Sequence, residues 1–258
     1  MLGEQLRLTP KNLSISIVCH GHGQKVKEVL QDLQPLMLGG AQVLLTLNIP
    51  EDEKFLDELL IKPELIRNAS KKGFGENHNQ AFLRVKRAWF AVINPDTRID
   101  PELFEGLDIF CQSRSIGAIA PVVIDALGNV ESSARYYPTL RRLFKRVGNR
   151  LFGKKLYPDY DSRVATVASV DWISGCFMLF YSRAYDLIGG FDSRYYMYLE
   201  DADVCLRLHL AGFKVLYCTK LHVIHHGQYA SRSQWRHFYW HIRSMTRFLW
   251  VSRKFKWD

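Results

Sequence analysis

The sequence predicts an α/β fold in which helices flank a mixed, mainly parallel sheet. Short apolar runs bounded by polar residues alternate with segments whose apolar residues recur at helical spacing, and this alternation is typical of parallel sheets. The 258 residues are 47% hydrophobic and 13% aromatic, a composition that excludes disorder, collagen and a coiled coil. A chain of this length buries a large core as one elaborate domain or as two small ones.

The first half of the chain contains the regular alternation. Leu13–Cys19 is expected to be a buried strand, and the helical spacing that follows it, from Val26 to Met37, ends at Gly39-Gly40. Pro50 and the three acids after it predict another helix start. The remaining elements expected here are strands at Gln42–Leu47, Leu65-Ile66 and Ala88–Ile93, and a helix from about Glu76 to Arg87.

The second half is less regular. Residues Val122–Ser132 predict a hairpin around Leu127-Gly128-Asn129, and the apolar residues from Leu140 to Leu151 predict an amphipathic helix. The other elements expected are strands at Val164–Val170, Ile173–Phe180 and Lys214–Cys218, a helix at Ala202–Leu210 closed by Gly212, and a helical tail from Ser231 onward. We therefore expect a body over residues 1–227 and a basic, aromatic tail over residues 228–258.

Cysteine use and hydropathy favour a cytosolic protein. The five cysteines are scattered and have no CxxC spacing, which argues for reduced thiols and against a disulfide scaffold or a zinc ribbon. No small-residue cleavage site follows the first apolar stretch, so we expect no signal peptide. The longest uncharged apolar stretch, Trp172–Ser182, is far shorter than the ~20 residues that span a bilayer.

The net charge of +9 is unevenly distributed. Residues 135–155 include eight basic residues and no acid, and residues 228–258 include seven basic residues and one acid, so the rest of the chain has a net charge of −5. Basic segments of this kind bind phosphates of nucleic acids, nucleotides or lipid headgroups, or are solvated faces.

The first candidate motif is Asn94-Pro95-Asp96, directly after the strand at Ala88–Ile93. Ligands of open α/β sheets bind at the carboxyl ends of strands. An Asp96 carboxylate there suits Mg²⁺ or Mn²⁺ bound to a diphosphate, although an ordinary turn has the same pattern. His225 is a candidate ligand of the same metal ion. It lies in His222-Val223-Ile224-His225-His226, and one of these histidines could complete an octahedral site begun by Asp96.

The second candidate motif is Glu200-Asp201-Ala202-Asp203, at the start of a helix. One of its acids is expected to cap the helix, and the helix dipole favours the ionised form of the others. An ionised carboxylate at a cleft is a competent general base. Capping alone is the alternative.

The third candidate motif is the glycine-containing loop Lys72-Gly73-Phe74-Gly75-Glu76-Asn77-His78-Asn79. Glycines at a helix start let backbone N–H groups approach a phosphate or nucleotide. The loop is neither GxGxxG nor GxxxxGK, which disfavours dinucleotide binding and Walker-type NTP binding.

In this order the motifs resemble those of family 2 glycosyltransferases with the GT-A fold. The resemblance covers about Ser14 to His226 and is strongest in three runs, Trp172-Ile173-Ser174-Gly175-Cys176-Phe177-Met178, Gly189-Gly190-Phe191-Asp192 and Glu200-Asp201-Ala202-Asp203. Tyr196–Asp201, Leu206–Gly212 and Ile224–His226 make the chain most similar to the bacterial rhamnosyltransferases of O-antigen and cell-wall polysaccharide synthesis.

The resemblance implies a role for each matching residue. Asn94 and Asp96 stand where the family has its DxD motif, so Asp96 would bind the metal and the donor diphosphate with help from His225. Asp201, paired with Glu200, matches the general base. The other matching positions are donor-binding Gly73, Gly75 and Asn79 and acceptor-binding Trp172, Ser174, Gly175 and Asp203.

One departure concerns the nucleobase. The family's second strand ends in an Asp that reads the base, whereas this chain has Asn48, which could substitute as a hydrogen-bonding group. The resemblance implies inverting transfer of L-rhamnose from dTDP-L-rhamnose, with Mg²⁺ or Mn²⁺, to a lipid-diphosphate-linked saccharide. A UDP-hexose or a galactofuranose donor is the alternative.

The tail predicts contact with a membrane. Its aromatic residues lie among basic ones at helical spacing, as in helices that bind an anionic leaflet, although packing on the body is the alternative. We expect a cytoplasmic protein, peripheral on the inner face of the bacterial plasma membrane. A nucleic-acid binder would share these basic segments, but no recognition motif is present, so nucleic acid is not an expected partner.

Overall fold

A mixed sheet forms the centre of the computed structural model, which describes residues 6–151, 159–160, 166–227 and 235–253. The strand order in these residues is β3-β2-β1-β4-β10-β6-β11-β5, with β8 paired to β11. The first four strands are parallel to one another, as the alternating pattern predicts: β1 (Leu13–Cys19), β2 (Gln42–Leu47), β3 (Glu64–Arg67) and β4 (Trp89–Ile93).

The second half of the sheet changes direction at β10 (Phe177–Tyr181), which is antiparallel to both β4 and β6 (Ile116–Asp125). The long strand β11 (Lys214–His225) is parallel to β6 and antiparallel to β5 (Thr97–Arg98) and β8 (Val167–Ser169). A separate pair, β7 (Ala134–Arg135) with β9 (Trp172–Ile173), lies outside this sheet. The expected mixed, mainly parallel sheet is confirmed.

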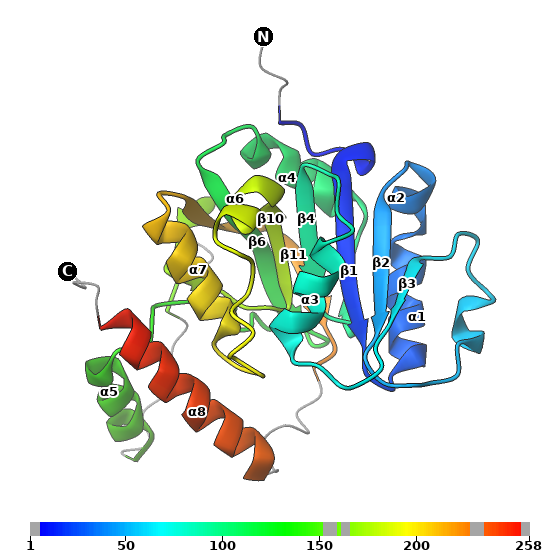
Figure 1. Cartoon of the computed structure of the whole chain (residues 1–258). Coiled ribbons are helices and arrows are strands. Elements are labelled where there is room, and N and C mark those ends of the chain that lie inside the picture. The colour runs from blue at the N-terminus through cyan, green and yellow to red at the C-terminus, as the bar shows by residue number, and fades with distance from the viewer. Residues whose placement is uncertain (1–5, 152–158, 161–165, 228–234, 254–258) are drawn as a thin grey trace.

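Helices cover the sheet because its central strands are apolar on both faces. Every residue of β4 and β10 is buried, as expected for strands with helices on both sides. The helices are α1 (Gly23–Asp32), α2 (Gln34–Leu38), α3 (Phe74–Phe82), α4 (Glu102–Cys111), α5 (Leu140–Leu151), α6 (Ser182–Leu187), α7 (Glu200–Leu210) and α8 (Trp235–Ser252). Figure 1 shows α3 in front of β1, and α5 and α8 at the lower left, away from the sheet.

Several element boundaries differ from those the sequence predicts. Val26–Met37 forms two helices rather than one, because Pro35 lies in the first turn of α2. The acids after Pro50 precede only a short 3-10 helix, Lys54–Leu56. The helix expected to reach Arg87 ends at Phe82, and the strand expected at Ile173–Phe180 is interrupted at residues 174–176.

The predicted hairpin and the amphipathic helix are present. Asp125 N–H donates to Asn129 O at 2.9 Å, and Asp125 Oδ1 accepts from Leu127 N–H at 2.8 Å, which closes the turn. α5 follows Pro138 as expected. Val164, Lys154 and Lys155 lie outside the described residues, as do the tail residues before Trp235 and after Arg253.

All five cysteines are free and buried. Burial raises the pKa of the Cys19, Cys176 and Cys218 thiols to about 12. In the described residues, we find no helix long and apolar enough to cross a membrane.

Candidate active site

A cleft of about 1040 Å³ opens at the carboxyl ends of β1, β2 and β4. Its walls come from the loops after these strands, from Glu131 to Arg135, from Tyr196 to Tyr198, from the end of β11 and from α8. The position agrees with the rule that ligands of open α/β sheets bind beyond the carboxyl ends of strands. The volume is at the upper end of the range for small-molecule sites.

Asp96 and His225 meet in this cleft, as the sequence predicts. β11 pairs with β5, which follows Asp96 directly, and His226 N–H donates to Asp96 O at 2.9 Å. These backbone contacts place Asp96 Oδ1 3.3 Å from His225 Nε2. Asn94 also lines the cleft, and its N–H donates to Cys176 O at 3.0 Å.

Glu131 is a third member of this group that sequence reasoning missed. Its Oε2 lies 3.2 Å from His225 Nδ1, so the imidazole is held between two carboxylates. The residue follows the turn of the predicted hairpin, and its N–H donates to Val123 O at 2.8 Å. The sequence feature that could have identified Glu131 is its position as an acid just after the turn of the predicted hairpin, next to a strand of the sheet.

Asp96 and His225 shift each other's pKa values toward their charged forms. Burial by itself would raise the pKa of Asp96, but the hydrogen bond to His225 and the charge of its ring outweigh burial and hold that pKa below its usual range. Burial opposes protonation of His225, yet Asp96 and then Glu131 raise its pKa above the usual value.

The donor set fits a hard divalent cation. Carboxylate oxygens are the ligands that Mg²⁺ and Mn²⁺ prefer, and a neutral imidazole is a common metal ligand in proteins. Asp96, Glu131 and His225 supply these groups in one wall of the cleft. In the part of the chain that the structure describes, no three such side chains already converge as a complete site, because His225 lies between the two carboxylates.

Asp201 begins helix α7 with two backbone hydrogen bonds. Its Oδ2 accepts from Gly175 N–H at 3.1 Å, and its Oδ1 accepts from Ala202 N–H at 2.9 Å. Burial raises the pKa of Asp201 above its usual value, although these N–H groups and the charge of Arg135 partly oppose the shift. Asp201 is not among the cleft-lining residues, whereas Arg135 is.

Glu200 precedes it as a buried acid. Glu200 is only 7% exposed, and its Oε2 has no hydrogen-bond partner among the described residues. Burial, and next the charge of Asp201, raise the pKa of Glu200 well above its usual value. The two acids therefore compete for ionisation, and the hydrogen bonds from Gly175 and Ala202 favour the ionised form of Asp201.

The chain enters α7 through a strained connection. Tyr198 and Leu199 have φ values of 73° and 61°, a region that costs a non-glycine residue about 1–3 kcal/mol. Two contacts hold the connection: Tyr198 Oη lies 2.8 Å from His237 Nδ1, and Asp203 N–H donates to Leu199 O at 2.9 Å.

The segment from Trp172 to Cys176 joins the two halves of the site. Ser174 N–H donates to Ser133 O at 2.8 Å, Gly175 N–H binds Asp201, and Cys176 O binds Asn94 N–H. Trp172 is 6% exposed, and its Nε1–H donates to Tyr136 O at 3.1 Å. In the structure, Gly175 therefore orients the Asp201 carboxylate, and Trp172 is held by the backbone of Tyr136.

Asn48 and Gly73 shape the opposite wall. The Asn48 carboxamide binds the backbone of Lys72, donating to its carbonyl at 3.0 Å and accepting from its N–H at 2.9 Å. A Cβ at Gly73 would lie 2.7 Å from Tyr196 O, so only glycine fits there. The basic residues of this wall, which the sequence analysis missed, are His20, His22, Lys25, Lys71 and Lys72.

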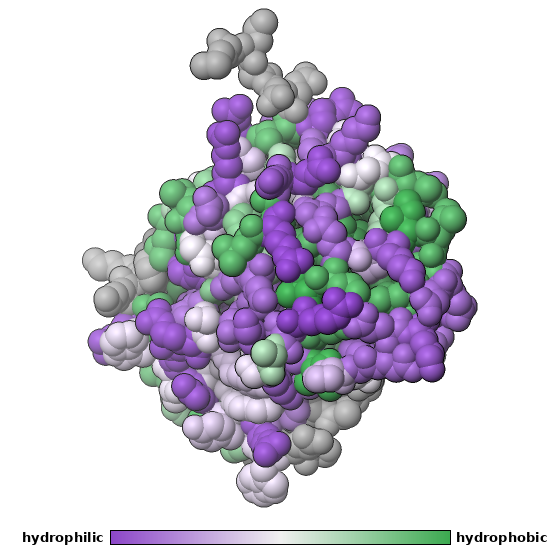
Figure 2. Space-filling model, turned by 45° about the vertical axis from the view of Figure 1, so that its right-hand side comes forward, coloured by the Kyte–Doolittle hydropathy of each residue, from purple (hydrophilic) through white to green (hydrophobic). Residues whose placement is uncertain are grey.

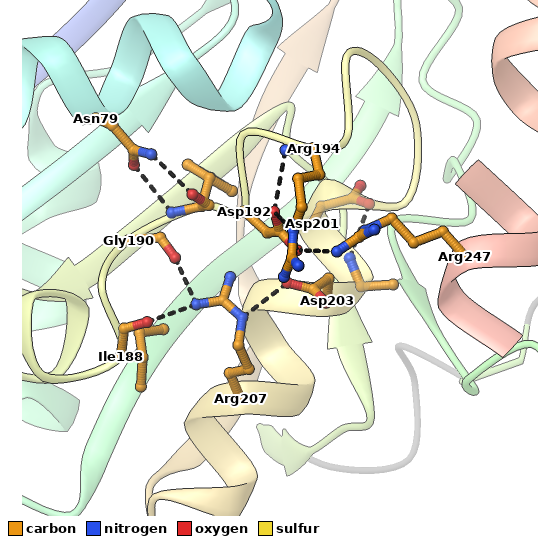
Figure 3. A network of polar contacts seen from close by, with 11 residues as sticks. Asn79, Ile188, Gly190, Asp192, Arg194, Asp201, Asp203, Arg207 and Arg247 are labelled. Carbon is orange, nitrogen blue, oxygen red and sulfur yellow. Dashed lines mark hydrogen bonds and ion pairs between the residues drawn. The ribbon is translucent and has the colours of Figure 1, made fainter. Parts of the chain in front are cut away.

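Three residues predicted to bind donor or acceptor hold the turn at residues 188–192 instead of lining the cleft. Figure 3 shows two of them, Asn79 and Asp203. Asn79 Oδ1 accepts from Tyr185 O–H at 2.6 Å and from Phe191 N–H at 2.9 Å. A Cβ at Gly75 would lie 2.5 Å from Phe191 Cβ. Asp203 is 1% exposed and binds Arg207 at 2.7 Å, and Arg207 donates to the carbonyls of Ile188 and Gly190.

Helix α8 contributes a wall of the cleft that the sequence did not predict. Arg236, His237 and Trp240 line it, and the Trp240 ring lies 4.8 Å from the ring of Tyr196. Ser244 Oγ–H donates to Met197 O at 2.9 Å, and the fully buried Phe248 stacks on Tyr137 at 5.8 Å. One face of α8 thus packs on the body.

The sequence is similar to those of known glycosyltransferases. Residues 11–257 match the sequence family described as "Glycosyltransferase like family 2". The chain is 27% identical to "Rhamnosyltransferase WbbL" of Escherichia coli (strain K12) over 252 residues, which cover 91% of each chain. It is 32% identical over 171 residues to "N-acetylglucosaminyl-diphospho-decaprenol L-rhamnosyltransferase" of Mycobacterium tuberculosis (strain CDC 1551 / Oshkosh), covering 62% of this chain and 54% of that protein.

Two solved structures share the fold. GalNAc-T7 with UDP, GalNAc and Mn²⁺ superimposes with a TM-score of 0.66 at 14% identity, covering 96% of this chain and 48% of that one. The mannosyltransferase PcManGT from Pyrobaculum calidifontis, in complex with GDP-Man and Mn²⁺, gives a TM-score of 0.63 at 12% identity, covering 97% of this chain and 67% of that one.

Proposed function

This chain belongs to glycosyltransferase family 2 and has the GT-A fold, and on that premise we propose that it transfers L-rhamnose from dTDP-L-rhamnose, with inversion, to a lipid-diphosphate-linked saccharide. The observation that most supports transfer is that residues 174–176 connect the Asp96 side of the cleft to Asp201 behind it, through the Asn94–Cys176 and Gly175–Asp201 hydrogen bonds. The names of the two bacterial relatives support rhamnose and, for the mycobacterial one, the diphosphate-linked acceptor.

The proposed reaction needs one base. Asp201 accepts the proton of the acceptor hydroxyl, whose oxygen attacks the anomeric carbon of the donor from the side opposite the diphosphate. The new C–O bond forms as the bond to the diphosphate oxygen breaks, and the nucleoside diphosphate leaves with that electron pair. The transition state is oxocarbenium-like, as in glycoside hydrolysis.

The leaving diphosphate is negatively charged, and the donor wall is basic. Lys25 of α1 and Lys71 and Lys72, from the loop between β3 and α3, line the cleft on this side. Asp96, Glu131 and His225 would hold a divalent cation, which supplies Lewis-acid neutralisation of the diphosphate when bound. The Mn²⁺ in both solved neighbours supports this part of the proposal.

Asn48, directly after β2, bears on the choice of nucleotide. Asn48 is 5% exposed and its carboxamide is occupied by Lys72 and Asn68, so in this conformation it shapes the loop rather than reading a base. A UDP-hexose or a galactofuranose donor therefore remains the alternative.

A thermal-shift panel tests the function. We expect dTDP-L-rhamnose with Mg²⁺ or Mn²⁺ to raise the melting temperature more than UDP-glucose, UDP-galactose or UDP-N-acetylglucosamine, because a ligand that binds only the folded state stabilises it. A larger shift with a UDP-sugar would identify that sugar nucleotide, rather than dTDP-L-rhamnose, as the donor. The absence of a shift with every donor would count against the whole function.

We also propose that the protein acts at an anionic membrane surface on the cytoplasmic side. Four large side chains of α8 point away from the body and are exposed at i, i+3, i+4 and i+7: Trp235 (87%), Phe238 (63%), Tyr239 (61%) and Ile242 (49%). We call them the exposed face of α8. α5 likewise exposes Leu140 and Phe144 beside Arg141 and Lys145. Aromatic and basic residues together suit a lipid interface.

Helix α8 begins at the lower end of the molecule in Figure 1. Figure 2, coloured by hydropathy, shows near-white residues beside hydrophilic ones at this end. Trp and Tyr are near neutral on that scale, and they prefer the boundary between water and lipid. The division into residues 1–227 and 228–258 stays a prediction, and the contacts of α8 with the body argue that the two parts function together.

A further inference from the structure

The cleft contains a second group of cations, separate from those of the donor wall. Arg236 and His237 come from α8 and Arg135 from β7, whereas the donor wall comes from α1 and from the loops after β1, β2 and β3. The charges of the two groups act on different acids, since Lys25 affects Asp96 and Arg135 affects Asp201. The donor diphosphate accounts for only the first group.

The second group lies beside the proposed base. α8 holds the three residues that precede Leu199 and α7: Trp240 contacts Tyr196, Ser244 binds Met197 O and His237 binds Tyr198 Oη. A molecule bound against Arg236 and His237 is therefore next to the strained connection into Glu200-Asp201. That is where an acceptor has to present its hydroxyl.

The chemistry of this wall fits a sugar diphosphate. Arginine binds phosphate oxygens through paired N–H groups, and a histidine ring N–H adds a further donor. The rings of Trp240 and Tyr196, at 44° to each other, present flat apolar faces beside these cations. A volume of about 1040 Å³ also exceeds what one small ligand needs.

We propose that α8 is the acceptor-diphosphate site of this enzyme: Arg236 and His237 bind the diphosphate, and Trp240 with Tyr196 contacts the sugar attached to it. The inference rests on the proposed function, because it takes the acceptor to be a saccharide joined to lipid through a diphosphate. It assigns a second role to the helix, whose exposed face would lie on the membrane while its opposite face binds the head of the lipid-linked acceptor.

Isothermal titration calorimetry on the full-length protein, with two short-chain probes, tests the proposed acceptor-diphosphate site. One is N-acetylglucosaminyl-diphospho-octane, and the other is octyl N-acetylglucosaminide, which lacks the diphosphate. Arg236→Ala should weaken binding of the first probe by about 10- to 100-fold, the effect of losing a hydrogen bond to a charged group, and leave the second unchanged. The matched control is Arg243→Ala, two turns along α8 and outside the cleft, which should change neither affinity by more than about twofold.

A second pair of variants tests the sugar contact. Trp240→Ala should weaken both probes, because both have the sugar, whereas Trp250→Ala, at an exposed position of the same helix, should weaken neither. Equal losses in Arg236→Ala and Arg243→Ala, or no binding of the diphosphate probe to the wild type, would overturn the inference. Binding that depends on Arg236 in a protein that no sugar nucleotide stabilises would retain the site and reject the proposed donor.

Discussion

Asp201 is the residue on which the proposed chemistry depends most directly. Replacement by Asn should lower the transfer rate ~10²–10⁴-fold, the usual size of a general-base contribution, with donor affinity nearly unchanged because donor contacts lie on the other wall. Steady-state rates and donor titration measure both quantities. Since burial raises the pKa of Asp201, wild-type activity should fall on the acid side at a pH above the ordinary carboxyl value of about 4. Near-normal turnover in the variant would remove Asp201 from the mechanism.

Glu200 should destabilise the fold at neutral pH. A carboxyl whose pKa is higher in the folded than in the unfolded protein stabilises the fold below its unfolded value of about 4.3 and loses that contribution as the pH rises through its folded value. Burial and Asp201 raise the pKa of Glu200 in this way, and Gln does not titrate. Glu200→Gln should therefore gain stability relative to the wild type as the pH rises from 4 to 8.

Chemical denaturation at several pH values measures this gain. Glu105→Gln is the matched control, because water solvates that exposed carboxylate in the first turn of α4. A difference between Glu200→Gln and the wild type that does not change with pH would contradict the assignment of Glu200 as a buried acid.

At the scale of elements, we propose separate roles for two faces of α8. Phe238→Ser combined with Tyr239→Ser should weaken binding to phosphatidylglycerol vesicles about tenfold or more, because both side chains lose apolar area that the lipid would bury. Co-sedimentation measures this binding. Leu83→Ser, 85% exposed at the end of α3, is the control for removing an exposed apolar side chain elsewhere. Equal vesicle binding by the wild type and the Phe238→Ser/Tyr239→Ser variant would exclude the exposed face of α8 as the membrane contact.

Element types were easier to predict from the sequence than side-chain roles. The strands at Leu13–Cys19 and Gln42–Leu47 have the predicted bounds because apolar runs flanked by polar residues specify buried strands. Helix ends depend on tertiary contacts, so the predicted end at Arg87 was wrong by five residues. The contact of α8 with Tyr196–Tyr198 joins residues about 40 positions apart, and no local pattern encodes it.

At the scale of the whole molecule, the resemblance correctly predicted the fold and family, and the structure shows which motif residues meet. Asp96 and His225 lie together, whereas Asn79 and Asp203 stabilise the turn beneath the site. A motif identifies residues that a family needs, but it does not separate those that touch a ligand from those that hold the backbone. Glu131 shows the converse, since it joins the site through the fold alone.

The antiparallel insertion of β10 between β4 and β6 has a consequence for synthesis of the protein. β4 ends at Ile93 and its partner β10 begins at Phe177, so the ribosome adds roughly 80 residues before that edge is paired, which takes about 4–16 s at ~5–20 residues per second. During this interval a fully apolar strand edge is exposed on the nascent chain. The half-made sheet is then a target for chaperones and a site for aggregation.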